Sequence, residues 1–327
     1  MLTANQQRHR IAQLINQDNQ TDRQTDKYYD EAMSYIREHL MAFYQQYADE
    51  NGLSIQQTQQ QVSTWDLQEW QSAINEMQVD SSWPQEATDR MKVYGTIAGL
   101  DRGHMLTAIL ALGLIRLTVR NRKATSKRID EDATQEMTRM KNAFNLDEIQ
   151  RNRLVQKAQD LKKTTTYYPH QTPRSVITKP ETTQIWSKKI WIDTDTMTND
   201  VENLVYKHLQ NGMNLQDLRN LLMGHVNPNQ FKPNASVADR VKQAQYQTMR
   251  IVRSESSRMI NGINMATYKM HGITQVEVVG EPGICQYCQG IVDANPYKID
   301  DAPQPPFHPN CRCELVPYLD EQKSLAY

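Results

Sequence analysis

The sequence 285-CQYCQGIVDANPYKIDDAPQPPFHPNCRC-313 contains all four cysteines of the chain. Cys285-x-x-Cys288 places two thiols on one tight turn, and His308-x-x-Cys311 repeats that spacing with an imidazole in place of one sulfur. Two such knuckles can supply four ligands to one tetrahedral metal ion. The spacing therefore predicts a closed zinc-type site made of Cys285, Cys288, His308 and Cys311.

Cys313 is the ambiguous member of this group, because it lies only two residues beyond Cys311. It can replace Cys311 or His308 as a ligand, or it can be a small buried residue at the start of a strand. Two readings without metal remain open: the five side chains simply pack together, or two cysteines form a disulfide in an oxidising space. Clustered cysteines in a protein made in a reducing cytosol favour metal binding over disulfides.

Upstream of the cysteines the apolar period changes from helical to strand-like. Met249, Val252, Met259 and Ile263 recur on one face of a predicted long helix that Gly272 ends. The run 274–279, TQVEVV, is typical of a β-strand. Two shorter helices are predicted before this one, with N-caps at Asp195 or Thr196 and at Asn214.

The first half of the chain is predicted to be helical. Apolar residues at three- and four-residue steps place one helix before Asn51-Gly52 and another before Pro84. A third helix is predicted from Pro84 to about Phe144, and it includes the apolar run 105–115. That run is far shorter than the roughly 20 residues of a membrane-spanning helix, so we expect it to be a buried core segment.

An unbalanced basic run follows on the same predicted helix. Its members are Arg116, Arg120, Arg122, Lys123, Lys127 and Arg128. Two interpretations are open, a solvated helix face and a surface that contacts DNA phosphates.

Composition limits the classes of function. The chain has 327 residues, a formal net charge of -1 and only 12 glycines. The near-neutral total predicts no nucleic-acid or membrane partner through bulk charge, so any such partner must meet a local patch. The N-terminal residues have no basic and apolar regions typical of a secretory signal, and we expect synthesis in the cytoplasm.

The C-terminal two-fifths of the chain, about 185–318, resembles the Mu F-like head-morphogenesis domain of phage minor head proteins. The resemblance rests on Arg253-Ser254-Glu255 in a long helix, the β-type run, Cys-x-x-Cys, and the final motif 308-HPNCRC-313. The family more often has Arg-Thr-Glu where this chain has Arg253-Ser254-Glu255, and serine retains the hydroxyl group. We expect this triplet to be structural, either holding its helix against the Cys/His tail or contacting a partner.

The resemblance implies a minor structural protein of a tailed phage, located in the head interior or at the portal vertex after synthesis in the bacterial host. Its implied partner is the portal protein, with capsid or scaffolding protein and DNA as further candidates, and its implied action is head assembly or DNA delivery. We expect no enzymatic activity and a structural Zn²⁺. Two rival functions remain: a zinc-containing nuclease or toxin-like effector, and a DNA-binding protein that escorts the genome.

The predicted fold is mainly α, with an elongated helical N-terminal body and a C-terminal α+β domain that ends in a small zinc-knuckle-like β element. Three prolines and a threonine-rich stretch predict a linker. The predicted domains are 1–162, a helical N-terminal domain; 163–182, the linker; 183–272, the helical part of the Mu F-like domain; and 273–327, the Cys/His tail.

Overall fold

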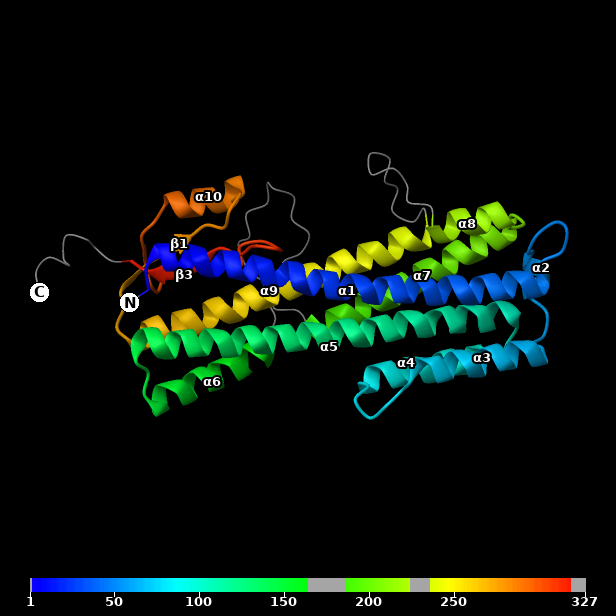
Figure 1. Cartoon of the computed structure of the whole chain (residues 1–327), viewed down its shortest axis with the longest axis horizontal. Coiled ribbons are helices and arrows are strands. Elements are labelled where there is room, and N and C mark those ends of the chain that lie inside the picture. Colours follow the sequence, from blue (N-terminus) through cyan, green and yellow to red (C-terminus); the bar gives the residue numbers. More distant parts are fainter. Residues whose placement is uncertain (1, 164–185, 224–235, 319–327) are drawn as a thin grey trace, which may run out of the picture. The chain divides into compact units, whose positions relative to one another are not determined.

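The computed structural model describes residues 2–163, 186–223 and 236–318. It is mainly helical, with one small antiparallel sheet near the C-terminus (Figure 1), which confirms the predicted fold class. The helices are α1 (Ala4–Tyr47), α2 (Ile55–Thr58), α3 (Thr64–Met77), α4 (Gln85–Ile97), α5 (Arg102–Phe144), α6 (Glu148–Lys163), α7 (Trp186–Gln210), α8 (Leu215–Met223), α9 (Val237–Met270) and α10 (Gln286–Asp293). The strands are β1 (Gln275–Val279), β2 (Tyr297–Lys298) and β3 (Glu314–Pro317).

The chain forms two compact units, and neither is continuous in sequence. Unit 1 consists of 1–22, 124–188 and 249–327, and unit 2 consists of 23–123 and 189–248. This division differs from the predicted consecutive domains, because α1, α5 and α9 each contribute residues to both units. The predicted linker at 163–182 lies outside the described residues, except for Lys163, the last residue of α6.

Unit 2 is built on the apolar run of α5. Leu106, Leu110 and Leu114 are buried there, together with Ile36 and Leu40 from the predicted stripe of α1. Among the described helices, α5 has one window long and apolar enough to cross a membrane, but 78% of that window is buried inside the structure. As expected, this apolar run packs in a protein core.

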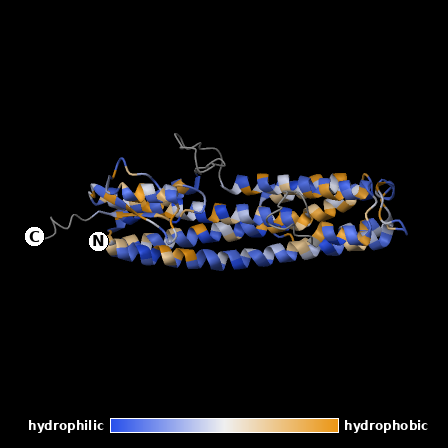
Figure 2. Cartoon of the chain, turned by 90° about the horizontal axis from the view of Figure 1, so that it is seen from above, coloured by the Kyte–Doolittle hydropathy of each residue, from blue (hydrophilic) through white to orange (hydrophobic). Residues whose placement is uncertain are grey.

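Hydrophobic and hydrophilic residues alternate along the helices (Figure 2), as the periodicity of the sequence predicts.

Capping side chains determine where several of these helices begin. Ser63 begins α3 with a capping box, in which its Oγ accepts from the backbone N–H of Asp66 and the Asp66 carboxylate accepts from the Ser63 N–H. Asn214 caps α8, because its Oδ1 accepts from the Asp217 N–H at 2.8 Å, as predicted.

Two helix boundaries differ from the prediction. The single helix expected from Pro84 to Phe144 is broken between α4 and α5, where Asp101 accepts a hydrogen bond from the His104 N–H at 2.9 Å and caps the new helix. Helix α7 begins at Trp186, before the predicted caps. Asp195 is inside that helix and instead accepts two hydrogen bonds of 2.6 Å from the Arg90 guanidinium.

The sheet of unit 1 has the strand order β2-β1-β3, with Val278 of β1 opposite Leu315 of β3. Side chains satisfy backbone groups on the outer side of β3. The amide oxygen of Asn261 on α9 accepts from the Leu315 N–H at 3.0 Å, and the hydroxyl of Tyr268 donates to the Leu315 carbonyl at 3.1 Å. Helix α9 therefore takes the place of a fourth strand and positions the chain immediately after the cysteines.

Candidate metal centre

The first knuckle is formed by the start of α10. Cys285 is the N-cap residue of that helix, and its Sγ accepts from the backbone N–H of Cys288 at 3.4 Å. This hydrogen bond turns the two thiols toward the same side of the chain. The N-terminal end of a helix also favours negative charge, which suits a thiolate ligand.

The second knuckle precedes β3. The backbone N–H of Cys311 donates to the His308 carbonyl at 3.1 Å, and Asn310 adopts a left-handed conformation with φ of 71°. Asparagine tolerates this conformation better than most residues. The resulting tight turn brings the His308 ring and the Cys311 thiol to the same point.

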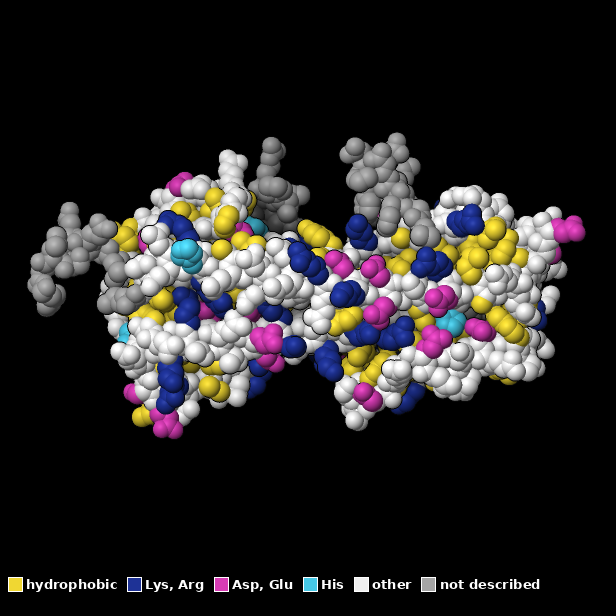
Figure 3. Space-filling view, in the orientation of Figure 1, with side chains coloured by type: hydrophobic (Ala, Val, Ile, Leu, Met, Phe, Trp, Pro, Cys, Tyr) yellow, Lys and Arg dark blue, Asp and Glu magenta, His cyan; other side chains and the backbone are white. Residues whose placement is uncertain are grey.

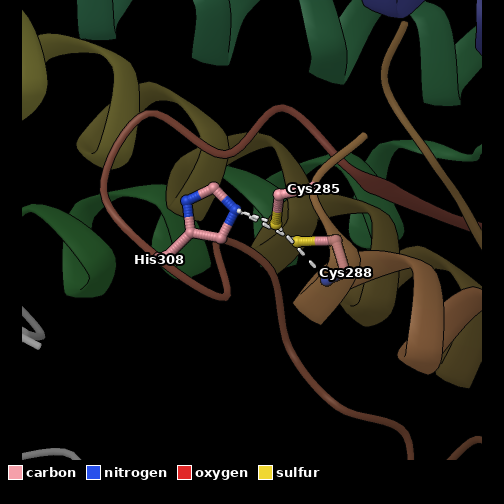
Figure 4. A group of neighbouring side chains, drawn as sticks. All are labelled: Cys285, Cys288 and His308. Atoms are coloured by element: carbon pink, nitrogen blue, oxygen red, sulfur yellow. Dashed lines mark hydrogen bonds between the residues drawn. The ribbon is translucent and has the colours of Figure 1, made fainter. Parts of the chain in front are cut away.

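Three of the predicted side chains, Cys285, Cys288 and His308, converge in space (Figure 4). Nε2 of His308 lies 3.3 Å from the Sγ of Cys285 and 3.1 Å from the Sγ of Cys288, and 3.9 Å separates the sulfurs of Cys288 and Cys311. A tetrahedral ion with metal–sulfur bonds of about 2.3 Å requires sulfurs about 3.8 Å apart and nitrogen–sulfur distances of about 3.5 Å. These three contacts are therefore close to the spacing that one metal ion requires.

Two further donors lie at the same place. Cys313 forms a second group with Cys288 and Cys311, and Glu281 forms a third with His308 and Cys311; within each group the ligand atoms are less than 4.8 Å apart. Both readings of Cys313 as a ligand therefore remain available. Glu281 was not predicted, because a single acid after a strand gives no spacing signal.

A backbone contact orients the imidazole. Nδ1 of His308 lies 2.8 Å from the Pro309 carbonyl oxygen, which can only accept a hydrogen bond. The proton of a neutral ring is therefore on Nδ1, and the lone pair of Nε2 points toward the sulfurs. Metal-binding histidines commonly have such a partner on the second nitrogen.

The surroundings of the thiols separate their acidities. Burial opposes ionisation of Cys285, but the N–H of Cys288 and the His308 ring outweigh it and lower the pKa of Cys285. The Cys288 thiol, a hydrogen-bond partner of Cys311, lowers the pKa of Cys311 well below its usual range, while the pKa of Cys288 itself rises. The lowered pKa values of Cys285 and Cys311 favour the thiolate, which is the form that binds a metal.

The cluster can hold a metal ion, and its donors differ in burial: Cys285 is exposed and His308 is half-buried. Cys288, Cys311 and Cys313 are completely buried. A tetrahedral ion bound by four protein side chains has no open position for a water molecule or substrate. The arrangement suits a structural role for a bound ion.

The triplet Arg253-Ser254-Glu255 lies on α9 within unit 1. The Arg253 guanidinium pairs with Asp22 of α1, and the buried Glu255 accepts from Arg258 at 2.7 and 3.0 Å. Burial raises the pKa of Glu255, and Arg258 opposes that rise. Both charged members of the triplet therefore form ion pairs inside the protein, whereas Ser254 is half-buried.

A buried ionic network was missed in the sequence. Its centre is Arg312, between Cys311 and Cys313, which contacts Asp18 of α1 and Ser256 of α9. Arg128 of α5 joins it through Asp18 at 3.2 Å and Asp132 at 2.7 Å. Residues 18 and 312 are far apart in sequence, so no local pattern could reveal their pairing.

The basic run of α5 is largely engaged by protein groups. Arg116 donates to the Glu76 carbonyl at 3.0 Å, Arg120 pairs with Glu31, and Arg128 is buried in the ionic network. Lys127 is exposed and forms an ion pair with the nearby Glu131, Lys123 is exposed, and Arg122 is half-buried. On the face seen in Figure 3, basic and acidic side chains are interspersed.

Comparisons with known proteins add no constraint on this site. No protein-family model, curated protein or solved structure matches the chain. The functional argument therefore depends on the residues and their geometry.

Proposed function

We propose that this chain is a minor structural protein of a tailed-phage head, associated with the portal and acting in head assembly or DNA delivery. The proposal is supported by the ordered motif from Arg253-Ser254-Glu255 to 308-HPNCRC-313, which resembles the Mu F-like family. The observation that carries it is the convergence of Cys285, Cys288 and His308, with the Cys311 sulfur 3.9 Å from that of Cys288. The proposed metal has a structural role, and no enzymatic activity is proposed.

Zinc is the metal that this donor set fits best. Thiolate sulfur with one imidazole nitrogen in a tetrahedral arrangement is typical of structural zinc sites. Bound zinc would add to the hydrophobic core that the tail shares with α1, α5, α6 and α9 in unit 1. Elemental analysis of protein purified without added metal should find about one zinc per chain, and less than about a tenth of an equivalent would contradict the proposal.

Serine variants would identify the fourth ligand. If Cys311 is the ligand, Cys311→Ser should lose zinc affinity and Cys313→Ser should retain it, because serine is a much poorer zinc ligand than a thiolate. The reverse result would assign Cys313. Equal losses would show that the two thiols act together.

The head-protein assignment is tested on virions. Mass spectrometry of purified particles should detect the chain in few copies, and it should co-purify with the portal protein encoded by the same genome. A Cys285→Ser variant, which removes one proposed metal ligand, is compared with the wild type in the same assay. Abundant protein in the infected cell but none in purified virions would refute the assignment.

The alternative function, a zinc nuclease, requires a different kind of metal site. A zinc nuclease needs an open metal position beside a general base, whereas the four proposed ligands would fill a tetrahedral set. Supercoiled plasmid incubated with zinc-loaded protein should remain intact. Cleavage that is lost in Cys285→Ser would favour the nuclease over the structural protein.

A further inference from the structure

The metal ligands and the start of α1 are joined by two side-chain contacts within unit 1. Arg312 binds Asp18, with 2.8 Å between Nε and Oδ2 and a second contact from Nη2 to Oδ1. Gln7 donates to the carboxylate of Glu314. We call these two pairs the α1 anchor, and both tail residues of the anchor directly adjoin Cys313.

The α1 anchor lies on one buried stripe of the helix. Gln7, Ile11, Leu14 and Asp18 follow each other at steps of four, three and four residues, and at most 3% of each residue is exposed. Ile11 and Leu14 supply the apolar middle of the stripe, while its two polar ends contact the tail. The first turns of α1 are thus held at both ends of the stripe by Arg312 and Glu314.

Asp18 and Arg312 belong to a buried group of charges, so Arg312 must stay in place for these charges to remain paired. Asp18 is buried and lies 3.2 Å from Arg128 Nη2 as well as against Arg312. The Arg312 side chain is 1% exposed, and its Nη1 also donates to Ser256 at 2.8 Å. A buried charge that loses its partner is strongly disfavoured, so a displaced Arg312 would leave α1 without this contact and expose the network to water.

The metal ligands control the backbone at this point. Arg312 is flanked by Cys311 and Cys313, and the Cys311 thiol lies within 4.8 Å of the Glu281 carboxylate. A bound ion would fix this backbone through its bonds to sulfur.

We propose that Arg312 and Glu314 couple metal binding to the docking of α1. Metal ligation holds the segment Arg312–Glu314, that segment holds residues 4–22 through the α1 anchor, and loss of the metal releases residues 4–22. Arg312 is a positioning residue in this mechanism. The coupling rests on the proposed metal centre and adds to it a metal-dependent change in the N-terminal helix.

Hydrogen exchange of the wild-type protein tests the release directly. Zinc-loaded protein and protein treated with a zinc chelator are compared, with the zinc content measured on the same samples. Removal of zinc should speed exchange in peptides from 4–22 at least about tenfold and leave peptides from 29–47 of the same helix unchanged. Faster exchange in 311–318 without any change in 4–22 would overturn the coupling and leave the metal centre standing.

Thermodynamic reciprocity supplies a second test. If the metal stabilises docking of α1, docking must stabilise the bound metal by the same factor. Asp18→Asn should therefore weaken zinc affinity by about fivefold or more in competition with a chromophoric chelator. Glu255→Gln is the matched control, because it also alters a buried carboxylate paired with an arginine, but both partners lie on α9.

The outcomes separate the two proposals. Zinc affinity equal in Asp18→Asn, the control and the wild type would overturn the coupling. Should Asp18→Asn fail to fold, Gln7→Leu removes the other half of the α1 anchor and carries the same expectation. A wild-type protein that binds no zinc would refute the metal centre and the coupling together.

Discussion

Replacing Asn261 with leucine should destabilise the tail, because its amide serves β3 in place of a neighbouring strand. The variant leaves the buried N–H of Leu315 without its acceptor at 3.0 Å, and the Ser257 carbonyl loses a donor at 2.9 Å. An unsatisfied buried donor costs about 1–3 kcal/mol, and a lost hydrogen bond contributes about 1 kcal/mol. We expect a loss of about 2–4 kcal/mol in the free energy of opening of β3.

The same helix offers a matched control. Asn264 is also completely buried, but neither its amide nitrogen nor its amide oxygen has a hydrogen-bond partner in the described part of the chain. Asn264→Leu therefore removes a buried polar group that makes no hydrogen bond, and the substitution should be neutral or stabilising. The two substitutions are chemically identical and have opposite expected effects.

Hydrogen exchange of peptides that cover 312–318 measures the opening of β3 without requiring the whole chain to unfold in one step. A change of about 2–4 kcal/mol corresponds to exchange about 30-fold to 1,000-fold faster in Asn261→Leu. Asn264→Leu should exchange at the wild-type rate or more slowly. Equal rates in the two variants would refute the role given to Asn261.

Three further predictions concern the metal, one turn and pH. Cys288→Ser should lose bound zinc and speed exchange in the tail, and a variant that keeps a full equivalent of zinc would contradict the ligand assignment. Gly52→Ala should lower the melting temperature of unit 2, because φ is +97° and a Cβ would lie 2.2 Å from the Met213 carbonyl oxygen; an unchanged temperature would argue against this turn. Burial raises the pKa of Glu255 despite its pairing with Arg258, so the folded state binds the extra proton and wild-type stability should fall, relative to Glu255→Gln, as pH rises from 4.5 through the folded pKa. Thermal denaturation of both proteins across that range checks the sign, and a constant difference would refute it.

Local patterns predicted the features that depend on local chemistry. The knuckle spacings brought Cys285, Cys288, His308 and Cys311 to one cluster, and the cap at Asn214 and the helix end at Gly272 are where the sequence placed them. Each of these depends on a few adjacent residues. Turn geometry, capping and periodicity therefore carried this part of the prediction.

Features that depend on distant partners were missed. Asp195 has the side chain of a helix cap, but its partner Arg90 on another helix keeps it inside α7. Asp18 and Arg312 look like ordinary solvated charges until the fold buries them together. The break before α5 depends on the cap that Asp101 forms. The free energies of a capped break and of a continuous helix differ by only a small amount.

The interleaved composition of the units limits how the protein can be dissected. Because α1, α5 and α9 each supply residues to both units, no single cleavage of the chain yields one complete unit. A recombinant fragment that ends near residue 162 would lack the 249–327 part of unit 1, and a fragment of the tail alone would lack Asp18 and Ser256. Functional mapping of this protein therefore calls for point substitutions in the full chain, since deletions would remove part of a hydrophobic core.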